Sequence, residues 1–178
     1  MRAAARAAVD WATSAGNRTA VLIPDHPVND PDWSLNGFGL AIGTGTPVGL
    51  AEGIARWLLG ERSANVVAPG TDLSHYDCVL VMGEGSSART EKAPGHLHPA
   101  AVGFDDQVLA ALGSADAAAL ARLDGPLAAE VGASGAPVWQ ALGAAVQAVS
   151  TAHVDLAEDP YGVLYLVARW TVRWAAPA

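Results

Sequence analysis

Short apolar runs alternate with amphipathic segments along most of the chain, and this alternation predicts a mixed α/β fold. Three apolar runs, at residues 20–24, 64–68 and 79–82, are too short for buried helices and therefore predict strands. The run at 79–82 is continuous rather than alternating, which predicts an interior strand of a parallel sheet that is covered on both faces. A further apolar run at 38–42 predicts another strand.

The segments between these runs carry apolar residues at helical spacing. The alanine-rich residues 2–14 predict a first helix that ends near Gly16. Residues 47–60 predict a second helix, with Thr46 as its cap and Pro47 at its first position, where the missing N–H of proline costs nothing. Further helices are predicted over residues 100–113, from Ser114 and Asp116 onward, over 126–133 and over 136–149.

The last part of the chain changes from helical to strand patterning. Residues 163–172, and a shorter stretch that contains Val154 and Leu156, are rich in β-branched and aromatic residues, and the turn sequence Glu158–Gly162 separates them. We predict a β-hairpin that joins the sheet late. The expected architecture is a single α/β domain over residues 1–178, with a mostly parallel central sheet flanked by helices.

Composition narrows the classes of function and partner. The 178 residues carry a net charge of −8 and no basic cluster, which argues against binding to nucleic acid or to anionic membranes. No apolar run is long enough to span a bilayer, and the N-terminus lacks the pattern of a secretory signal, so a cytoplasmic protein is expected. The only cysteine, Cys78, lies in a predicted strand and is expected to be an inert core thiol.

A polar loop over residues 83–95 follows the strand predicted at 79–82. Gly83 and Gly85 allow a sharp turn at the carboxyl end of that strand, which is where open α/β sheets bind ligands. The loop then collects charged and hydroxyl side chains: Glu84, Ser86, Ser87, Arg89, Thr90, Glu91 and Lys92. Hydroxyl, guanidinium and ammonium groups suit an anionic ligand. Alternatively, the two cations of the loop pair with its two glutamates and merely fix its conformation.

This loop and the chain that follows it resemble the class III extradiol ring-cleavage dioxygenase superfamily, and more narrowly its LigB-like proteins of unknown function from high-GC bacteria. The residues that carry the resemblance are Val79–His96, Phe104-Asp105, Trp139, Asp159–Val163 and Ala168–Trp170, so it covers roughly residues 77–170. The resemblance implies a mostly parallel sheet flanked by helices, and Fe(II) held by two histidines and one carboxylate. The first strand of the family fold, with its metal histidine, has no counterpart in this chain.

Carried over position by position, the resemblance implies a degenerate iron site. The second metal histidine corresponds to His26, beside Asp25. The family's acid/base motif, Gly-Asp-Leu-Ser-His, corresponds here to Gly-Glu-Gly-Ser-Ser, which puts Ser87 where the histidine belongs. Ser87 and Glu84 in this segment are the candidate catalytic residues. The metal carboxylate would come from residues 132–138, which contain no acidic side chain.

Other histidines and one glycine-rich segment are further candidates. The sequence Asp72–His75 spells the acid/base motif almost literally but precedes the strand, so its histidine is expected in a surface loop. His96 and His98 could form a weak metal pair but, beside prolines, are expected to be exposed loop residues. His153 lies in a predicted strand and is expected to be hydrogen-bonded there. The segment Gly43–Gly49 precedes a helix, as phosphate-binding loops do, but departs from the GxGxxG spacing.

Three functions stay open on the sequence. In the first, the chain is a LigB-like protein with a degenerate metal site that binds a small anionic or aromatic ligand without the usual catechol cleavage. Its ligand-binding residues would be Ser86, Arg89, Lys92, Asp25 and His26. In the second, it is a divergent dioxygenase that uses Fe(II) or another divalent metal. Its metal ligands would be drawn from His26, Asp25, Glu84, His75 or His96. In the third, it is a non-catalytic partner-binding or structural module whose open sheet edge pairs with another chain, as in a homo-oligomer.

Overall fold

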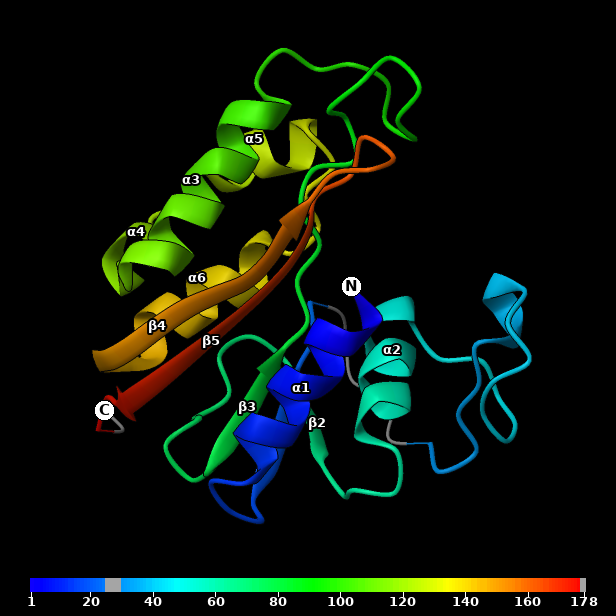
Figure 1. Cartoon of the computed structure of the whole chain (residues 1–178), viewed down its shortest axis with the longest axis vertical. Helices are drawn as coiled ribbons and strands as arrows, with labels where there is room; N and C mark the ends of the chain where they lie inside the picture. Colours follow the sequence, from blue (N-terminus) through cyan, green and yellow to red (C-terminus); the bar gives the residue numbers. More distant parts are fainter. Residues whose placement is uncertain (25–29, 177–178) are drawn as a thin grey trace.

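The structure is a computed structural model that describes residues 1–24 and 30–176. Helices and strands alternate in the first part of the chain, four helices follow in succession after β3, and two long strands end the described part; the strands form two sheets (Figure 1). In chain order the elements are α1 (Arg2–Thr13), β1 (Thr19–Leu22), the 3₁₀ turn η1 (Asn36–Phe38), α2 (Leu50–Leu59), β2 (Asn65–Val67), β3 (Cys78–Val81), α3 (Ala101–Ser114), α4 (Ala117–Ala121), α5 (Gly125–Glu130), α6 (Ala136–Ala145), β4 (Val146–Glu158) and β5 (Tyr165–Trp174).

The first sheet has three strands in the order β2-β1-β3, so the first strand of the chain lies at its centre. Both neighbours run parallel to β1, with Val21 opposite Val66 on one side and opposite Leu80 on the other. The three strands that the apolar runs predict are confirmed, as is their parallel arrangement. The prediction that β3 is an interior strand is wrong, because within the described residues β3 pairs with β1 alone and lies at an edge of the sheet.

Helices cover both faces of this sheet and give it two cores. On one face Val21 and Ile23 pack with side chains from α1 and α2. On the other face Ala20 and Leu22 join a larger core with α3, α4, α5 and α6. Successive side chains of a strand point to opposite faces, so the unbroken apolar run of β1 supplies both cores at once.

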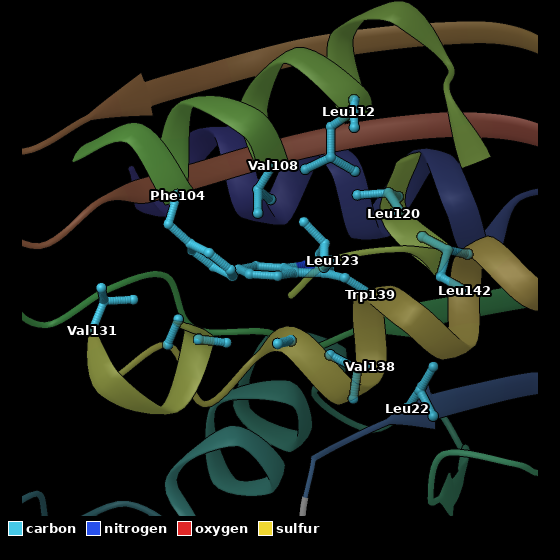
Figure 2. Packing of buried hydrophobic residues seen from close by; sticks show 14 of the residues in the cluster. Leu22, Phe104, Val108, Leu112, Leu120, Leu123, Val131, Val138, Trp139 and Leu142 are labelled. Atoms are coloured by element: carbon cyan, nitrogen blue, oxygen red, sulfur yellow. The ribbon is translucent and has the colours of Figure 1, made fainter. Parts of the chain in front are cut away.

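The larger core is built around two aromatic side chains, Phe104 of α3 and Trp139 of α6, which lie next to each other in Figure 2. Val108 and Leu112 follow Phe104 at intervals of one helical turn and continue the same apolar stripe. All four side chains are buried, so α3 and α6 are joined through one packed layer.

The C-terminal hairpin is confirmed, but β4 and β5 form a separate two-stranded antiparallel sheet and do not continue the parallel sheet as predicted. Two indole N–H groups of β5 attach the hairpin to the domain. Trp170 Nε1 donates to the Leu112 carbonyl at 2.7 Å, and Trp174 Nε1 donates to the Tyr76 carbonyl at 3.2 Å. The hairpin is therefore held through side chains, and not by extension of the backbone ladder of the parallel sheet.

Pairing within the hairpin is interrupted three times. The register shifts leave Gln147, Ser150 and Asp155 of β4 without an opposite residue in the ladder. Extra residues of this kind are β-bulges, which bend the strand and increase its twist. The Ser150 hydroxyl donates to the Thr171 carbonyl at 3.1 Å, so one bulge is also fixed by a side chain.

The prediction of a strand at residues 38–42 is wrong, because this segment folds back on itself instead of entering a sheet. The Leu35 N–H donates to the Ile42 carbonyl at 2.7 Å, which closes a short loop around η1. Gly39 ends η1 with a φ of +73°, a left-handed conformation that glycine adopts readily. Phe38 and Leu40 consequently lie on the surface.

Three helices are shorter than predicted, and one of them, α5, ends at Glu130, three residues before its predicted end. Helix α2 starts three residues late, with Gly49 and not Thr46 in the cap position. The Val48 N–H donates to the Ser34 carbonyl at 3.3 Å, so the chain before α2 bonds to the preceding loop instead. Helix α6 ends at Ala145, four residues before its predicted end, because β4 begins at the next residue.

The other helices form where the pattern predicts them. The Asp116 carboxylate caps α4 by accepting a hydrogen bond from the Ala119 N–H at 2.8 Å. Leu120 and Leu123 are buried, as predicted for this segment. No helix in the described part of the chain is long and apolar enough to cross a membrane.

Candidate functional site

The loop 83–95 leaves the carboxyl end of β3 and lies against α3, the segment before α6 and the tip of the hairpin (Figure 1). Ser86, in the middle of this loop, is fully buried. Its N–H donates to Asp105 Oδ1 at 2.8 Å and its hydroxyl donates to Asp105 Oδ2 at 2.7 Å. Asp105 projects from α3 and has no exposed surface, so this carboxylate fixes the loop from inside the protein.

Arg89 connects this buried carboxylate to the surface. Its Nη1 donates to Asp105 Oδ2 at 2.9 Å, whereas its Nε and Nη2 donate to Asp159 Oδ2 at 3.3 and 3.0 Å. Burial lowers the pKa of Arg89, but the hydrogen bonds to the two carboxylates outweigh burial and the pKa is raised. Arg89 therefore helps to fix the loop, as one alternative predicted. Its partners, however, are aspartates from α3 and the hairpin and not the loop's own glutamates.

The two candidate catalytic residues, Ser87 and Glu84, are held by the segment that precedes α6. The Ser87 N–H donates to the Val131 carbonyl at 3.1 Å, and the Glu84 carboxylate accepts from the Ser134 hydroxyl at 2.9 Å. A Cβ at Gly132 would lie 2.3 Å from Ser87 Oγ, so the serine hydroxyl fits because a glycine stands opposite it. Among the described residues, no histidine is hydrogen-bonded to either candidate.

The candidate ligand-binding residues divide into three groups. Ser86 and Arg89 are brought together on a shared carboxylate, but the Ser86 hydroxyl is buried and used there, so it cannot also bind a ligand. Lys92 is exposed in the same loop. Asp25 and His26, the latter also the candidate metal ligand, lie outside the described residues.

Of the remaining histidines, His96 is exposed, as predicted, whereas His98 is half-buried and not exposed as predicted. The His75 side chain is 76% exposed, as predicted for a surface loop, with its Nε2 lying 3.2 Å from an Asp72 carboxylate oxygen. His98 Nδ1 accepts from the Ala100 N–H at 3.3 Å at the start of α3, and His153 is exposed on β4. Within residues 1–24 and 30–176, no three histidine, cysteine or acidic side chains could together hold a metal ion.

The glycine-rich segment before α2 has a packing role. A Cβ at Gly43, whose φ is +106°, would lie 2.1 Å from the Trp33 carbonyl oxygen. A Cβ at Gly45 would lie 2.6 Å from the Asp32 side chain. The absence of side chains at both positions allows the segment to lie directly on the backbone of the preceding loop, which accounts for the glycines without a phosphate.

Two open pockets lie away from the loop 83–95. One, of about 530 Å³, lies at the amino ends of β1 and β2 and is lined mainly by polar side chains, among them Arg18, Asn65 and Tyr76. The other, of about 900 Å³, lies between residues 69–74 and α6 and is lined in part by alanines. Residues of the loop 83–95 line neither of these two pockets.

Two residues that organise the loop, Asp105 and Asp159, were not among the predicted site residues. A signal for Asp105 was present in the sequence, because it lies in the apolar stripe of α3 with Ala101 and Val108 at helical spacing. A carboxylate inside such a stripe requires a buried partner. Asp159 gave no comparable signal, because it lies in a turn where aspartate is common.

No family model and no curated protein matches this chain. The resemblance to the LigB-like proteins therefore stays a prediction.

Proposed function

We propose that this chain is a LigB-like protein with a degenerate metal site that binds a small anionic or aromatic ligand at loop 83–95 without the usual catechol cleavage, and the geometry of the loop favours a ligand with a negative charge. The part about the scaffold rests on the resemblance of residues 77–170. The part about the ligand rests on the geometry of the loop.

The orientation of the Arg89 guanidinium is the observation on which the proposal rests. Buried Asp105 holds Nη1, so the opposite edge of the guanidinium, with Nε and Nη2, is directed to the hairpin tip near the surface. These two N–H groups form the planar fork that recognises carboxylates. Lys92, exposed in the same loop, adds a second cation in a chain whose net charge is −8. A small anion would therefore find here a cation that is already held in position.

Ser87 supports the non-catalytic part of the proposal. The histidine that the family has at this position transfers a proton, which a serine hydroxyl cannot do at neutral pH without an adjacent base. Glu84, the nearest candidate base in sequence, is engaged by the Ser134 hydroxyl at 2.9 Å.

Iron loading followed by a catechol assay tests the non-catalytic part. The protein is incubated anaerobically with Fe(II), desalted, analysed for iron, and then assayed in air for ring-cleaved product. We expect far less than one iron per chain and no ring cleavage. One iron per chain together with ring cleavage would refute the proposal and favour the divergent dioxygenase.

Calorimetric titration with benzoate tests the ligand part, because benzoate combines a carboxylate with an aromatic ring. We expect the wild-type protein to bind it. Arg89→Lys keeps a cation beside Asp105 but removes the fork, so we expect affinity to fall about tenfold. Arg169→Lys is the matched control, because this arginine pairs with Asp155 on the hairpin, and its affinity for benzoate is expected to be unchanged. Equal affinity in all three proteins would contradict the assigned site.

A further inference from the structure

We infer that Asp159 occupies the ligand position on Arg89 and that a small carboxylate ligand must displace it, so the hairpin tip acts as a built-in competitor. The inference rests on the proposed function, since it deepens the same site by naming the ligand class and the group that restrains binding. Asp159 belongs to the turn between β4 and β5, 70 residues from Arg89 in the sequence.

The geometry of the contact is that of a replaceable partner. Nε and Nη2 of Arg89 both donate to a single oxygen of Asp159, at 3.3 and 3.0 Å. By contrast, Arg169 meets Asp155 through two parallel hydrogen bonds to two oxygens, at 2.5 and 2.8 Å. A third arginine–aspartate pair, which ties the residue before β1 to the residue before β3, also uses both oxygens. A free carboxylate could make the two-oxygen contact with Arg89 that the tethered aspartate does not make.

The two carboxylates on Arg89 differ in burial. The Asp105 side chain is fully buried, that of Arg89 is 11% exposed and that of Asp159 is 55% exposed. An exposed ion pair contributes little, because water and salt compete with it, whereas a buried pair is costly to break. A ligand would therefore replace Asp159 and leave the buried half of the network unchanged.

The turn that carries Asp159 also offers an apolar surface. A Cβ at Gly162 would lie 2.4 Å from Thr90 Oγ1, which shows that the tip lies directly on the loop. Tyr161, which lies between Asp159 and Gly162 in the turn, is 75% exposed. Its ring packs edge-on against that of Tyr165, with the ring centroids 6.5 Å apart. The turn that carries Asp159 therefore also carries an exposed aromatic ring, the kind of surface on which a flat apolar body packs.

Removal of the competing charge tests the inference. Asp159→Asn removes the charge with little change of shape, and we expect benzoate to bind about fivefold more tightly than to wild type. Asp155→Asn, a matched change on the same hairpin, and Asp159→Glu, which keeps the charge, are expected to bind as wild type does. Benzamide, the uncharged analogue, is expected to bind none of them.

The Nε–H resonance of Arg89 gives a readout that a general loss of structure would not produce. We expect it to shift in Asp159→Asn without ligand and to return toward its wild-type position when benzoate is added. Unchanged circular dichroism and melting temperature verify the fold. Asp159→Ser serves as a second variant if the asparagine disturbs the tip.

The outcomes separate this inference from the proposed function. If wild type binds benzoate and neither Asp159→Asn nor Asp159→Ser binds it more tightly, the role of Asp159 as competitor is wrong and the proposed function stands. If neither wild type nor the variants bind benzoate, the proposed function is wrong and the inference fails with it.

Discussion

Asp105 shows what a buried charge requires in this fold. It accepts hydrogen bonds from the Ser86 N–H, the Ser86 hydroxyl and Arg89, and it has no exposed surface. Three donors and one opposite charge compensate for the loss of water around the carboxylate. The same residue therefore fixes the position of α3 relative to the loop and the orientation of the arginine.

Substitution of this carboxylate should be far more harmful than substitution of an exposed one. We expect Asp105→Asn to lower the free energy of unfolding by about 3 kcal/mol, because it leaves the largely buried Arg89 without its inner partner. Asp155→Asn, in the partly exposed pair with Arg169, is expected to cost about 1 kcal/mol or less. Urea unfolding of both variants checks this, and equal losses would contradict the view that burial sets the difference.

The sequence predicts Cys78 as an inert core thiol, and the thiol is indeed buried. Burial raises its pKa to about 11. Because the folded pKa is the higher one, the thiol favours the folded state below the unfolded pKa of about 8.5 and loses this effect as pH rises through the folded value. At pH 8 we expect iodoacetamide to modify the native protein at least about a hundredfold more slowly than the urea-unfolded protein, measured by mass spectrometry. Similar rates would contradict the burial of the thiol.

At the scale of helices and strands, close backbone contact decides where α4 and α6 lie. A Cβ at Gly143 would lie 2.4 Å from the Ala117 carbonyl oxygen and 2.5 Å from the Ala121 nitrogen. The two helices therefore touch through their backbones, which the helical pattern of the sequence did not reveal, because a glycine adds nothing to an apolar stripe.

A pair of glycine substitutions tests this contact. We expect Gly143→Ala to destabilise the protein by about 2 kcal/mol, because backbone atoms must move apart. Gly103→Ala is the control, since a Cβ there meets nothing within 4 Å on the surface of α3, and it should stabilise the protein by up to about 1 kcal/mol. Opposite signs in thermal or urea unfolding are the expected result, and equal effects would argue against the backbone contact.

Elements with a strong local period were predictable, and elements that depend on distant contacts were not. The apolar runs gave the three parallel strands, and the 3.6-residue period gave most of the helices. The strand predicted at 38–42 was wrong, because an apolar pentapeptide fits a strand or an exposed turn equally well. Here the hydrogen bond from the Leu35 N–H to the Ile42 carbonyl closes a turn. The end of α6 was also missed, because Val146 suits either a helix or a strand.

At the scale of the whole molecule, ion pairs join segments that are far apart in the sequence. Arg18 meets Asp77 and so ties the residues before β1 and β3 together, while Arg89 meets Asp159 across 70 residues. The loop and its arginine could be located from the sequence but these partners could not, because pairing over such separations leaves no local pattern. The loop was thus predictable as a polar segment after a strand, whereas its internal network was not.

These pairs predict how stability depends on pH. Hydrogen bonds from Arg18 lower the pKa of Asp77, and hydrogen bonds from Arg169 lower the pKa of Asp155. A carboxylate with a lowered folded pKa stabilises the folded state above its unfolded pKa of about 4, and the effect disappears as pH falls through the folded value. Urea unfolding should therefore show falling stability below about pH 4, with a shallower fall in Asp155→Asn. An identical slope in that variant would count against this origin.

The bulges of β4 are expected to limit aggregation of the protein at high concentration. This strand is the longest in the protein, and its outer side has no strand partner among the described residues. A regular strand edge of that length could pair through backbone hydrogen bonds with a strand of a second copy. Three inserted polar residues put its N–H and C=O groups out of step, so an incoming strand could match only a few of them at a time. We expect the protein not to aggregate at high concentration. Light scattering should detect aggregation only in a variant from which the three bulge residues of β4 are deleted.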